Sequence, residues 1–273
     1  MRLNNKVILI TGSYTGIGLA IAKACINEGA KVVLNGLEDD QGKSVLSELD
    51  TENAVAITGD IAQAGIPELL VKKAIDTFGQ LNAVVNNAAM VPPSNVESTS
   101  TELMHKVMAV NAIAPLAIIQ SALPYLIPVQ GCVLNIGSIN AWGGEPGLLA
   151  YSMSKGALMT MTRNIGDSLF RDKGVRVNQI NPGWVLTERE MADKKKQGMV
   201  DDWYKDLPNI FAPAQRIFSP KEIAAAALYL LSDECGPVSG QVMDLEQFPM
   251  IGRNLPKEWD GSHDFSWSTR TKK

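Results

Sequence analysis

The 273-residue sequence has few cysteines, and their placement argues against two kinds of stabilised scaffold. Cys25, Cys132 and Cys235 lie far apart, are odd in number and form no Cys-x-x-Cys pair. A disulfide framework or a zinc site needs cysteines at short, regular spacings. We therefore expect no bound metal, and thiols that remain reduced in a reducing compartment.

The sequence also lacks a basic cluster. Its formal net charge is −4 at pH 7, and its pI is about 5.3. The one basic run, Lys194 to Lys196, is short, lies among acidic residues and is explained by a solvated helix face. Because nucleic-acid binding requires Lys and Arg gathered on one face, we expect no nucleic-acid partner.

Long hydrophobic runs are missing as well. No apolar run approaches the 18 residues that indicate a membrane span. Residues 1–6 lead directly into a strand-like segment and lack the apolar stretch and cleavage site of a signal peptide. We expect a cytoplasmic protein without a membrane partner.

Histidine is scarce, which bears on the kind of catalysis. His105 and His263 are the two histidines, and neither has a carboxylate or a cysteine at a telling spacing. A Ser-His-Asp hydrolase needs a histidine that a carboxylate orients. The sequence therefore disfavours that chemistry.

What the sequence does contain is an alternation of short apolar runs with longer helix-periodic segments. The predicted strands are 7–10, 31–34, 54–57, 83–85, 132–136 and 175–180, and the predicted helices are 16–28, 40–49, 65–78, 100–126 and 151–171. Near-continuous apolar strands favour a parallel sheet that is covered on both faces. We predict an α/β fold with a single doubly wound, Rossmann-type parallel sheet and helices on both faces.

One domain accounts for most of the chain, because no linker-like stretch and no repeat divides it. We assign residues 1–247 to this domain. Residues 184–218 break the alternation, with tryptophans among charges, and are predicted to form a lid over the carboxyl edge of the sheet. Residues 248–273 are a C-terminal extension, which is polar and aromatic and either docks as an arm or is partly disordered.

The first predicted strand ends in a glycine-rich turn, Thr11-Gly12-Ser13-Tyr14-Thr15-Gly16-Ile17-Gly18, that passes straight into a helix. Glycines let the backbone turn tightly and approach a pyrophosphate. The helix N-terminus then offers unpaired N–H groups and partial positive charge. A plain strand–helix turn also favours glycine, so the position after the first strand is what makes dinucleotide binding the better interpretation.

Tyr151 and Lys155 stand four residues apart at the start of a predicted helix, so both side chains lie on one helical face. A phenol has a pKa of about 10 and is a poor base at neutral pH. A nearby ammonium, and the positive charge of an oxidised nicotinamide, stabilise the phenolate. Tyr151 could then exchange a proton with an alcohol while hydride moves. Ser138, which follows a predicted strand at the ligand-binding edge, could hold the reacting oxygen.

Taken together, the motifs resemble those of the short-chain dehydrogenase/reductase family over residues 4 to 245. The matching pieces, in family order and spacing, are Thr11-Gly12-x-x-x-Gly16-Ile17-Gly18, Asp60, Asn86-Asn87-Ala88-Ala89, Asn111, Ser138, Tyr151-x-x-x-Lys155 and Asn181-Pro182-Gly183. Ala89 stands where the family usually has glycine, a change that is tolerable if the backbone there keeps a negative φ.

The resemblance implies a role for each motif residue. Tyr151 would be the catalytic acid/base, Ser138 would orient the substrate oxygen, Lys155 would lower the tyrosine pKa and hold the nicotinamide ribose, and Asn111 would anchor a proton-relaying water. The implied cofactor contacts are Gly12, Ser13, Thr15, Gly16, Ile17, Gly18, Leu37, Asp60, Ile61, Asn87, Tyr151, Lys155, Val185 and Thr187. Structural roles remain open beside these: Asn111 could satisfy a helix kinked at Pro115, and Asn87 could brace neighbouring strands.

The choice of cofactor depends on the end of the second strand. An acidic residue there binds the ribose 2′-hydroxyl of NAD, but by family alignment the position is Gly36. Leu37 and Thr15 occupy the places where a basic residue would bind the 2′-phosphate of NADP. Glu38 and Asp39 lie nearby and would repel that phosphate. We expect NAD as the preferred cofactor, with NADP as the alternative.

The substrate is less clearly encoded. The wall near the reacting carbon is expected from Asn140, Ala141, Trp142, Glu145 and Trp184, together with Ser138 and Tyr151. Polar groups beside tryptophans suit a sugar, polyol or sugar acid, whereas an acyl chain prefers an apolar groove. The tryptophans could equally just pack the lid.

Two other functions stay open. One is an NADPH-dependent 3-oxoacyl reductase, and the other is a non-catalytic, cofactor-binding regulatory protein. The presence of Asn111, Ser138, Tyr151 and Lys155 argues against the second. Family members commonly form tetramers through the helices that correspond to 100–126 and 151–171, so a homotetramer is expected.

Overall fold

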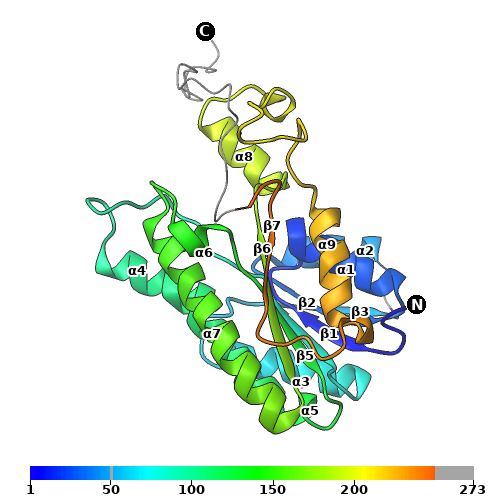
Figure 1. The fold of residues 1–273 in the computed structure, drawn as a ribbon. Coiled ribbons are helices and arrows are strands. Elements are labelled where there is room, and N and C mark those ends of the chain that lie inside the picture. Colours follow the sequence, from blue (N-terminus) through cyan, green and yellow to red (C-terminus); the bar gives the residue numbers. More distant parts are fainter. Residues whose placement is uncertain (50–51, 250–273) are drawn as a thin grey trace.

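The structure is a computed structural model, and it describes residues 1–49 and 52–249 of the chain (Figure 1). A seven-stranded sheet with the order β3-β2-β1-β4-β5-β6-β7 forms its centre, and every neighbouring pair of strands is parallel. The strands are β1 (Val7–Ile10), β2 (Lys31–Gly36), β3 (Ala54–Thr58), β4 (Ala83–Asn86), β5 (Cys132–Ile136), β6 (Arg176–Pro182) and β7 (Val242–Leu245).

Helices cover both faces of the sheet. One layer holds α1 (Gly16–Asn27), α2 (Asp39–Glu48) and α9 (Pro220–Leu231), whose apolar residues pack with the strands in one hydrophobic cluster. The other layer holds α3 (Ile66–Phe78), α5 (Ala114–Leu126) and α7 (Leu149–Lys173), with a second cluster beneath it. Figure 1 shows the two layers on opposite sides of the strands. The predicted doubly wound α/β fold is confirmed.

The remaining elements are short and lie mostly around the carboxyl edge of the sheet. They are α4 (Thr101–Met108), the π-helical turn η1 (Ala109–Ile113), α6 (Asn140–Gly143), α8 (Glu188–Lys196), and the 3-10 turns η2 (Trp203–Lys205) and η3 (Asp233–Cys235). The predicted helix 100–126 is therefore interrupted. The N–H of Ala114 bonds to the carbonyl of Ala109, five residues back, and Pro115 has no N–H to give to Asn111.

Helix α9 and strand β7 are the main elements that were not predicted from the sequence. Helix α9 begins with a capping box, in which Ser219 and Glu222 satisfy each other's backbone N–H groups, and with Pro220 in its first turn. Strand β7 is four residues long and only partly buried, so it lacks the continuous apolar pattern that reveals the other strands. It pairs in parallel with β6 and completes the sheet.

The expectation about membrane-length apolar segments needs a correction. The helical run Thr101–Leu126 contains an 18-residue window with a mean hydropathy of 1.6, which makes the run long and apolar enough to cross a membrane by length and composition. Forty-four per cent of its most apolar window is buried inside the protein. Its residues Ile118, Ile119, Ala122 and Leu126 pack under the sheet, so the run matches a core helix of the α/β fold.

Residues 184–218 stand above the carboxyl ends of β6 and β7 (Figure 1). We call this segment the lid. It has its own small apolar cluster, centred on Met199, Trp203, Leu207, Ala212 and Ile217. A bridge between Val185 and Phe218 closes its base. Of the predicted C-terminal extension, Phe248 and Pro249 are described, and residues 250–273 lie outside the described residues.

Candidate active site

Most of the predicted site residues lie at the carboxyl edge of the sheet, around its switch point. From β1 the chain winds outward to β2 and β3, and then crosses back so that β4 pairs with the other side of β1. Open α/β sheets bind ligands in the crevice at the carboxyl ends of such strands. The loops after β1, β4, β5 and β6, which carry Gly12, Asn87, Ser138 and Gly183, all emerge at this edge.

The loop after β1 is packed too closely for side chains at two of its glycines. A Cβ on Gly12 would lie 2.7 Å from the Cα of Ala88, and one on Gly18 would lie 2.3 Å from the carbonyl oxygen of Gly12. The N-cap of α1, Thr15, makes no side-chain cap, and the first turn of α1 holds no acidic residue. The N–H groups of this turn are thus left for an anion, so the residues present fit a dinucleotide pyrophosphate.

Asn87 is occupied with bracing the two strands that flank the switch point. Its side-chain amide donates to the carbonyls of Thr11 at 3.0 Å and Gly12 at 2.8 Å. Its own N–H, and that of Ala88, donate to the hydroxyl of Thr11. The structural interpretation of Asn87 is therefore supported. Ala89 has a negative φ, so its methyl group creates no backbone strain.

The other predicted cofactor residues differ in what they offer. Ser13 is buried, with its hydroxyl bonded to the carbonyl of Ile10 and the N–H of Asn35, and its own N–H donates to the carbonyl of Asn35. Asp60 accepts from the N–H of Ala62, and Ile61 is buried. Leu37 is 67% exposed.

The lid reaches the glycine-rich loop through one residue. Thr187 caps α8 by accepting from the N–H of Glu190, and its methyl carbon would lie 3.5 Å from a Cβ on Gly16. Val185, two residues earlier, is buried at the base of the lid. Thr187 thus brings the start of the lid against the loop that precedes α1.

Tyr151 and Lys155 lie on the same face of α7, as their spacing predicts. The Lys155 ammonium is 5.7 Å from the centre of the Tyr151 ring and donates to the carbonyl of Ile136 at 2.6 Å. Lys155 is 2% exposed, and burial lowers its pKa to about 7. Burial raises the pKa of Tyr151 to about 12, while a hydrogen bond with the Ser138 hydroxyl acts in the opposite direction.

Two charged side chains act on the pKa of Tyr151 in opposite directions. Glu145, in the turn before α7, raises the pKa of Tyr151 further, whereas Arg189, on α8 of the lid, lowers it. Sequence reasoning placed Glu145 near the substrate but missed Arg189. Nothing in the pattern of α8 distinguishes Arg189 from its other surface charges, so only the folded lid reveals it.

Asn111 lies in the π-helical turn, and its side chain is fully engaged. Its amide oxygen accepts from the N–H of Met90 at 2.7 Å, and its amide nitrogen donates to the carbonyl of Met90 and the hydroxyl of Ser154, both at 2.9 Å. Ser154 in turn donates to the carbonyl of Tyr151. Asn111 therefore ties the loop after β4 to the helix that carries Tyr151 and Lys155.

Ser138 is fixed by the next strand. Its N–H donates to the side-chain oxygen of Asn181 at 3.1 Å, and its hydroxyl accepts from the N–H of Asn140. Asn181 donates at 2.9 Å to Asp244 on β7, and the same carboxylate oxygen accepts from the indole N–H of Trp142 at 3.0 Å. Asp244 thus connects the strand that holds Ser138 to the predicted substrate wall.

These contacts are the end of a longer chain of buried hydrogen bonds across the sheet. Each side chain donates a hydrogen bond to the next, at 2.7 to 2.9 Å, and the chain ends at the Asp244 carboxylate. The chain runs Asn86, Asn135, Thr162, Gln179, Asn181 and Asp244. Because a carboxylate only accepts, it sets the direction in which the amides point. The side-chain oxygen of Asn86, at the other end, has no partner among the described residues.

The predicted substrate wall is partly used for packing. The Arg163 guanidinium lies over the ring of Trp142, 4.8 Å from the ring centre. Trp184 stacks on Trp203 with the ring centres 5.0 Å apart, and its indole N–H donates to Glu190. Asn140 donates to Glu145 at 2.9 Å. Asn140 and Glu145 are the polar pair of this wall, while Trp184 belongs to the core of the lid.

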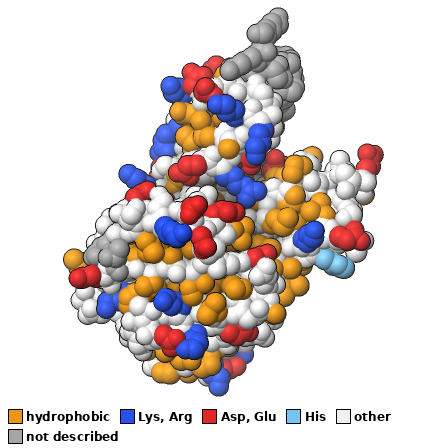
Figure 2. All heavy atoms as spheres, turned by 180° about the vertical axis from the view of Figure 1, so that it is seen from behind, with side chains coloured by type: hydrophobic (Ala, Val, Ile, Leu, Met, Phe, Trp, Pro, Cys, Tyr) orange, Lys and Arg blue, Asp and Glu red, His pale blue; other side chains and the backbone are white. Residues whose placement is uncertain are grey.

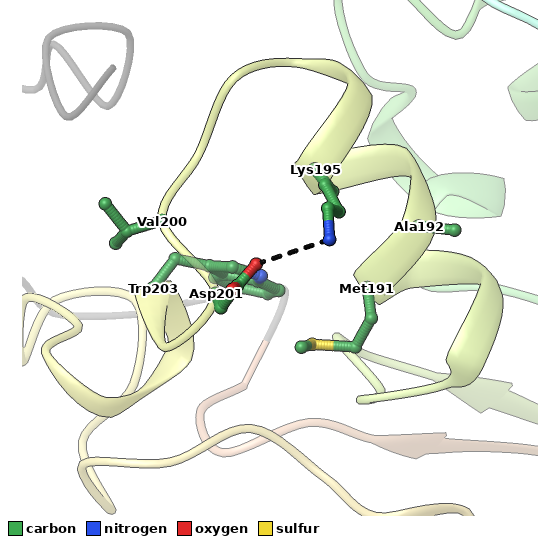
Figure 3. A pocket seen from close by; sticks show the side chains of 6 residues that line it. All are labelled: Met191, Ala192, Lys195, Val200, Asp201 and Trp203. Atoms are coloured by element: carbon green, nitrogen blue, oxygen red, sulfur yellow. Dashed lines mark ion pairs between the residues drawn. The ribbon is translucent and has the colours of Figure 1, made fainter. Parts of the chain in front are cut away.

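The lid contains a cavity of about 220 Å³, which Figure 3 shows from close by. Its lining consists of Met191, Ala192, Lys195, Val200, Asp201 and Trp203. Lys195 and Asp201 form an ion pair at 3.9 Å across it. None of the predicted catalytic residues lines this cavity, so it is a separate feature of the lid.

Comparison with known proteins agrees with this geometry. Residues 12–246 match a family model described as Enoyl-(Acyl carrier protein) reductase. The chain is 34% identical to L-fucose dehydrogenase of Mus musculus over 235 residues, which are 85% of this chain and 84% of that protein. It is 33% identical to 2-(S)-hydroxypropyl-CoM dehydrogenase 3 of Xanthobacter autotrophicus, over 88% of this chain and 94% of that protein.

A third relative, glucose 1-dehydrogenase 2 of Bacillus subtilis, is 32% identical over 250 residues, which are 88% of this chain and 93% of that protein. The matched region includes the glycine-rich loop, the Tyr151–Lys155 pair and the lid. The chain belongs to the short-chain dehydrogenase/reductase family, and it is an oxidoreductase that acts on CH–OH groups.

Proposed function

We propose that the protein is an NAD-preferring dehydrogenase of a secondary alcohol in a sugar, polyol or sugar acid. The observation that carries the proposal is the arrangement of Tyr151, Lys155, Ser138 and Asn111 around one crevice, beside a loop that fits a pyrophosphate. Each of the four is buried or half-buried and hydrogen-bonded within the site. A nicotinamide bound there would accept or supply the hydride.

In this proposal Tyr151 is the acid/base. A pKa raised to about 12 keeps the phenol protonated at neutral pH, so it can donate a proton to the oxygen of a carbonyl substrate. In the oxidative direction the phenolate must form first. Lys155, in its charged form, and Arg189 favour the phenolate, while Glu145 opposes it. Ser138 holds the reacting oxygen close to the phenol.

The preference for NAD rests on charge at the ribose end of the crevice. Position 36 is glycine, and neither Leu37 nor Thr15 supplies a cation for a 2′-phosphate. Asp39 opens α2 beside this position, and α2 has both Asp39 and Asp40 in its first turn. A phosphate dianion would meet negative charge there without a compensating guanidinium.

The substrate class rests on the polar pair of the wall. Asn140, the first residue of α6, and Glu145, in the turn before α7, can hydrogen-bond hydroxyl groups of a polyhydroxylated substrate. The names of two relatives, L-fucose dehydrogenase and glucose 1-dehydrogenase 2, support a sugar. The packing of Trp184 inside the lid leaves the stacking role to Trp142, which is 37% exposed.

A homotetramer is part of the proposal. Large apolar side chains are exposed on the layer of α5 and α7, and they include Ile113, Leu116, Tyr125 and Met153. The space-filling view from behind shows hydrophobic side chains gathered in patches between charged ones (Figure 2). Light scattering that gives four times the mass of one chain, and a smaller mass for Leu116→Glu, would support this assembly.

A second candidate, an NADPH-dependent 3-oxoacyl reductase, is favoured by one observation, the acyl-carrier description of the matching family model. The two candidates differ in cofactor and in substrate. A purified chain that oxidises NADPH with 3-oxoacyl thioesters, and leaves NAD and sugars unused, would decide for the second.

The test of the proposed function follows nicotinamide absorbance with NAD or NADP against sugars, polyols, hydroxy acids and hydroxyacyl thioesters. We expect NAD reduction with a polyhydroxylated substrate. Tyr151→Phe should lower kcat by about a thousandfold, within the range for loss of a general acid/base. Tyr229→Phe, at an exposed tyrosine of α9, is the matched control. Equal behaviour of Tyr151→Phe and the parent would point to a non-catalytic, cofactor-binding protein.

A further inference from the structure

Tyr14 is the aromatic side chain of the glycine-rich loop, and it is 4% exposed. Its ring lies against the end of β2 and the first turns of α2. A Cβ on Gly36 would be 2.1 Å from its Cδ2, and a Cβ on Gly42 would be 2.9 Å from its Cζ and hydroxyl oxygen. The hydroxyl forms a hydrogen bond with Thr58 at the end of β3, at 3.2 Å. The ring therefore links the loop to the ends of two strands.

Gly36 occupies the position where dinucleotide-binding folds select their cofactor. An acidic residue at the end of the second strand commonly accepts a hydrogen bond from the ribose 2′-hydroxyl. Here β2 ends at Gly36, and the space that a side chain at this position would need is filled by the ring of Tyr14. A 2.1 Å approach is far inside van der Waals contact, so the ring and a carboxylate at position 36 exclude each other.

We infer that Tyr14 is a specificity-determining residue for the cofactor: its ring replaces the side chain of position 36, so the adenine ribose is held without a carboxylate on its 2′-hydroxyl. The inference rests on the proposed nicotinamide-dependent function. An acidic residue at the end of the second strand both recognises the 2′-hydroxyl of NAD and rejects the 2′-phosphate of NADP. In this protein the two tasks are separated.

Rejection of a 2′-phosphate is then left to α2. Asp39 opens α2, and Gly42 of the same helix lies against the ring of Tyr14. Burial raises the pKa of Tyr14, the hydrogen bond with Thr58 lowers it, and the negative charge of Asp39 raises it. The phenol stays neutral and adds no charge of its own. A phosphate at this end meets Asp39, whereas a 2′-hydroxyl meets an aromatic ring. NAD is therefore preferred over NADP although its hydroxyl is not recognised.

The experiment measures Kd for NAD and for 2′-deoxy-NAD by quenching of tryptophan fluorescence, without turnover. For the parent chain we expect the two values to agree within about threefold, because no charge-assisted hydrogen bond is lost. Gly36→Asp should weaken the binding of both ligands, since the ring of Tyr14 blocks the new side chain. The double variant Tyr14→Ala, Gly36→Asp should bind NAD about tenfold more tightly than 2′-deoxy-NAD. A hydrogen bond from the 2′-hydroxyl to a charged acceptor provides a difference of this size.

Two controls separate the ring from other effects. Tyr14→Phe keeps the ring and removes the bond to Thr58, so the ratio of the two Kd values should stay near that of the parent. Tyr229→Ala, at an exposed site on α9, controls for loss of a tyrosine elsewhere. A parent chain that binds NAD tenfold or more tightly than 2′-deoxy-NAD overturns the inference and leaves the proposed function standing. A parent chain that binds no NAD overturns both.

Discussion

The two sides of the candidate active site are held together in different ways. On the cofactor side, Gly12 and Gly18 leave no room for side chains, and the Asn87 amide ties the loop after β4 to the loop after β1. On the lid side, Trp184 stacks on Trp203, and the ion pairs Arg189–Asp193 and Lys195–Asp201 are exposed to solvent.

This difference has a physical consequence. Buried backbone hydrogen bonds and close contacts leave one arrangement of the glycine-rich loop, which suits a ligand with a fixed shape. Exposed ion pairs contribute little to stability, so the lid depends on its small apolar cluster. A segment with few buried contacts opens at low free-energy cost. We therefore propose that substrate entry and selection vary on the lid side.

The largest effect should come from disturbing the cofactor side. Gly18→Ala places a methyl group 2.3 Å from the carbonyl oxygen of Gly12, and the loop must shift to relieve the overlap. Overpacking of this kind costs about 2 kcal/mol, so NAD binding should weaken about thirtyfold. Titration calorimetry with NAD measures the change. Gly143→Ala is the control, because a Cβ there meets nothing within 4 Å, and equal affinities of the two variants would contradict the prediction.

A smaller effect is expected at Asp244, which joins β6 to the predicted substrate wall through Asn181 and Trp142. Asp244→Leu leaves the donors of Asn181 and Trp142 without their acceptor and loosens the hold on Ser138. We expect kcat to fall about tenfold, with an unchanged Kd for NAD. Asp244→Asn keeps an oxygen that can accept from both donors and should recover most of the activity. If both variants lose the same activity, the hydrogen bonds are not the cause.

The pH dependence should distinguish the two directions of the reaction. Since the pKa of Tyr151 is raised to about 12, the phenolate fraction grows with pH throughout the neutral range. Alcohol oxidation, which needs the phenolate, should accelerate by up to about tenfold per pH unit from about pH 6 to pH 8. Carbonyl reduction uses the phenol and should not accelerate over this range. Initial rates in both directions measure this, and parallel profiles would show that Tyr151 does not carry the proton.

The smallest effect is expected in the lid. Trp203→Leu removes the ring on which Trp184 stacks and weakens the apolar cluster, while Trp203→Phe retains an aromatic partner. We expect KM for the alcohol to rise about fivefold in the Leu variant, corresponding to about 1 kcal/mol of lost packing, with little change in NAD affinity. Steady-state kinetics at saturating NAD provide the measurement. A change in NAD affinity instead would mean that the lid and the cofactor loop act as one unit.

Much of the cofactor side could be predicted because its chemistry is local in the sequence. The glycines of residues 12–18 follow a strand directly, and Tyr151 and Lys155 are one helical turn apart. Both features can therefore be recognised without knowledge of the fold. Strand β7 and the π-helical turn could not be predicted in the same way. Strand β7 is short and half-buried. The π-helical turn lies just before Pro115 in the run from α4 to α5, where this run packs against α7.

The convergence of distant residues was beyond sequence reasoning. Arg189 on α8 lowers the pKa of Tyr151 on α7, and Asp244 accepts a hydrogen bond from Trp142 across 102 positions of the chain. Tyr14 was visible in the glycine-rich loop, but its fit against Gly36 depends on how β1 and β2 pair. Tertiary contacts of this kind leave no periodic signal.

The buried chain of amides from Asn86 to Asp244 also bears on how the protein finds one fold. Asn86 is the register partner of Asn135, Asn135 of Gln179, and Asn181 of Asp244. A one-residue slip between strands would turn these side chains to the opposite face and leave several amides buried without partners. Apolar strands alone would tolerate such a slip more readily. The polar chain therefore acts against misaligned sheets, and a variant with Leu at Asn135 would be expected to populate compact but misregistered species during refolding.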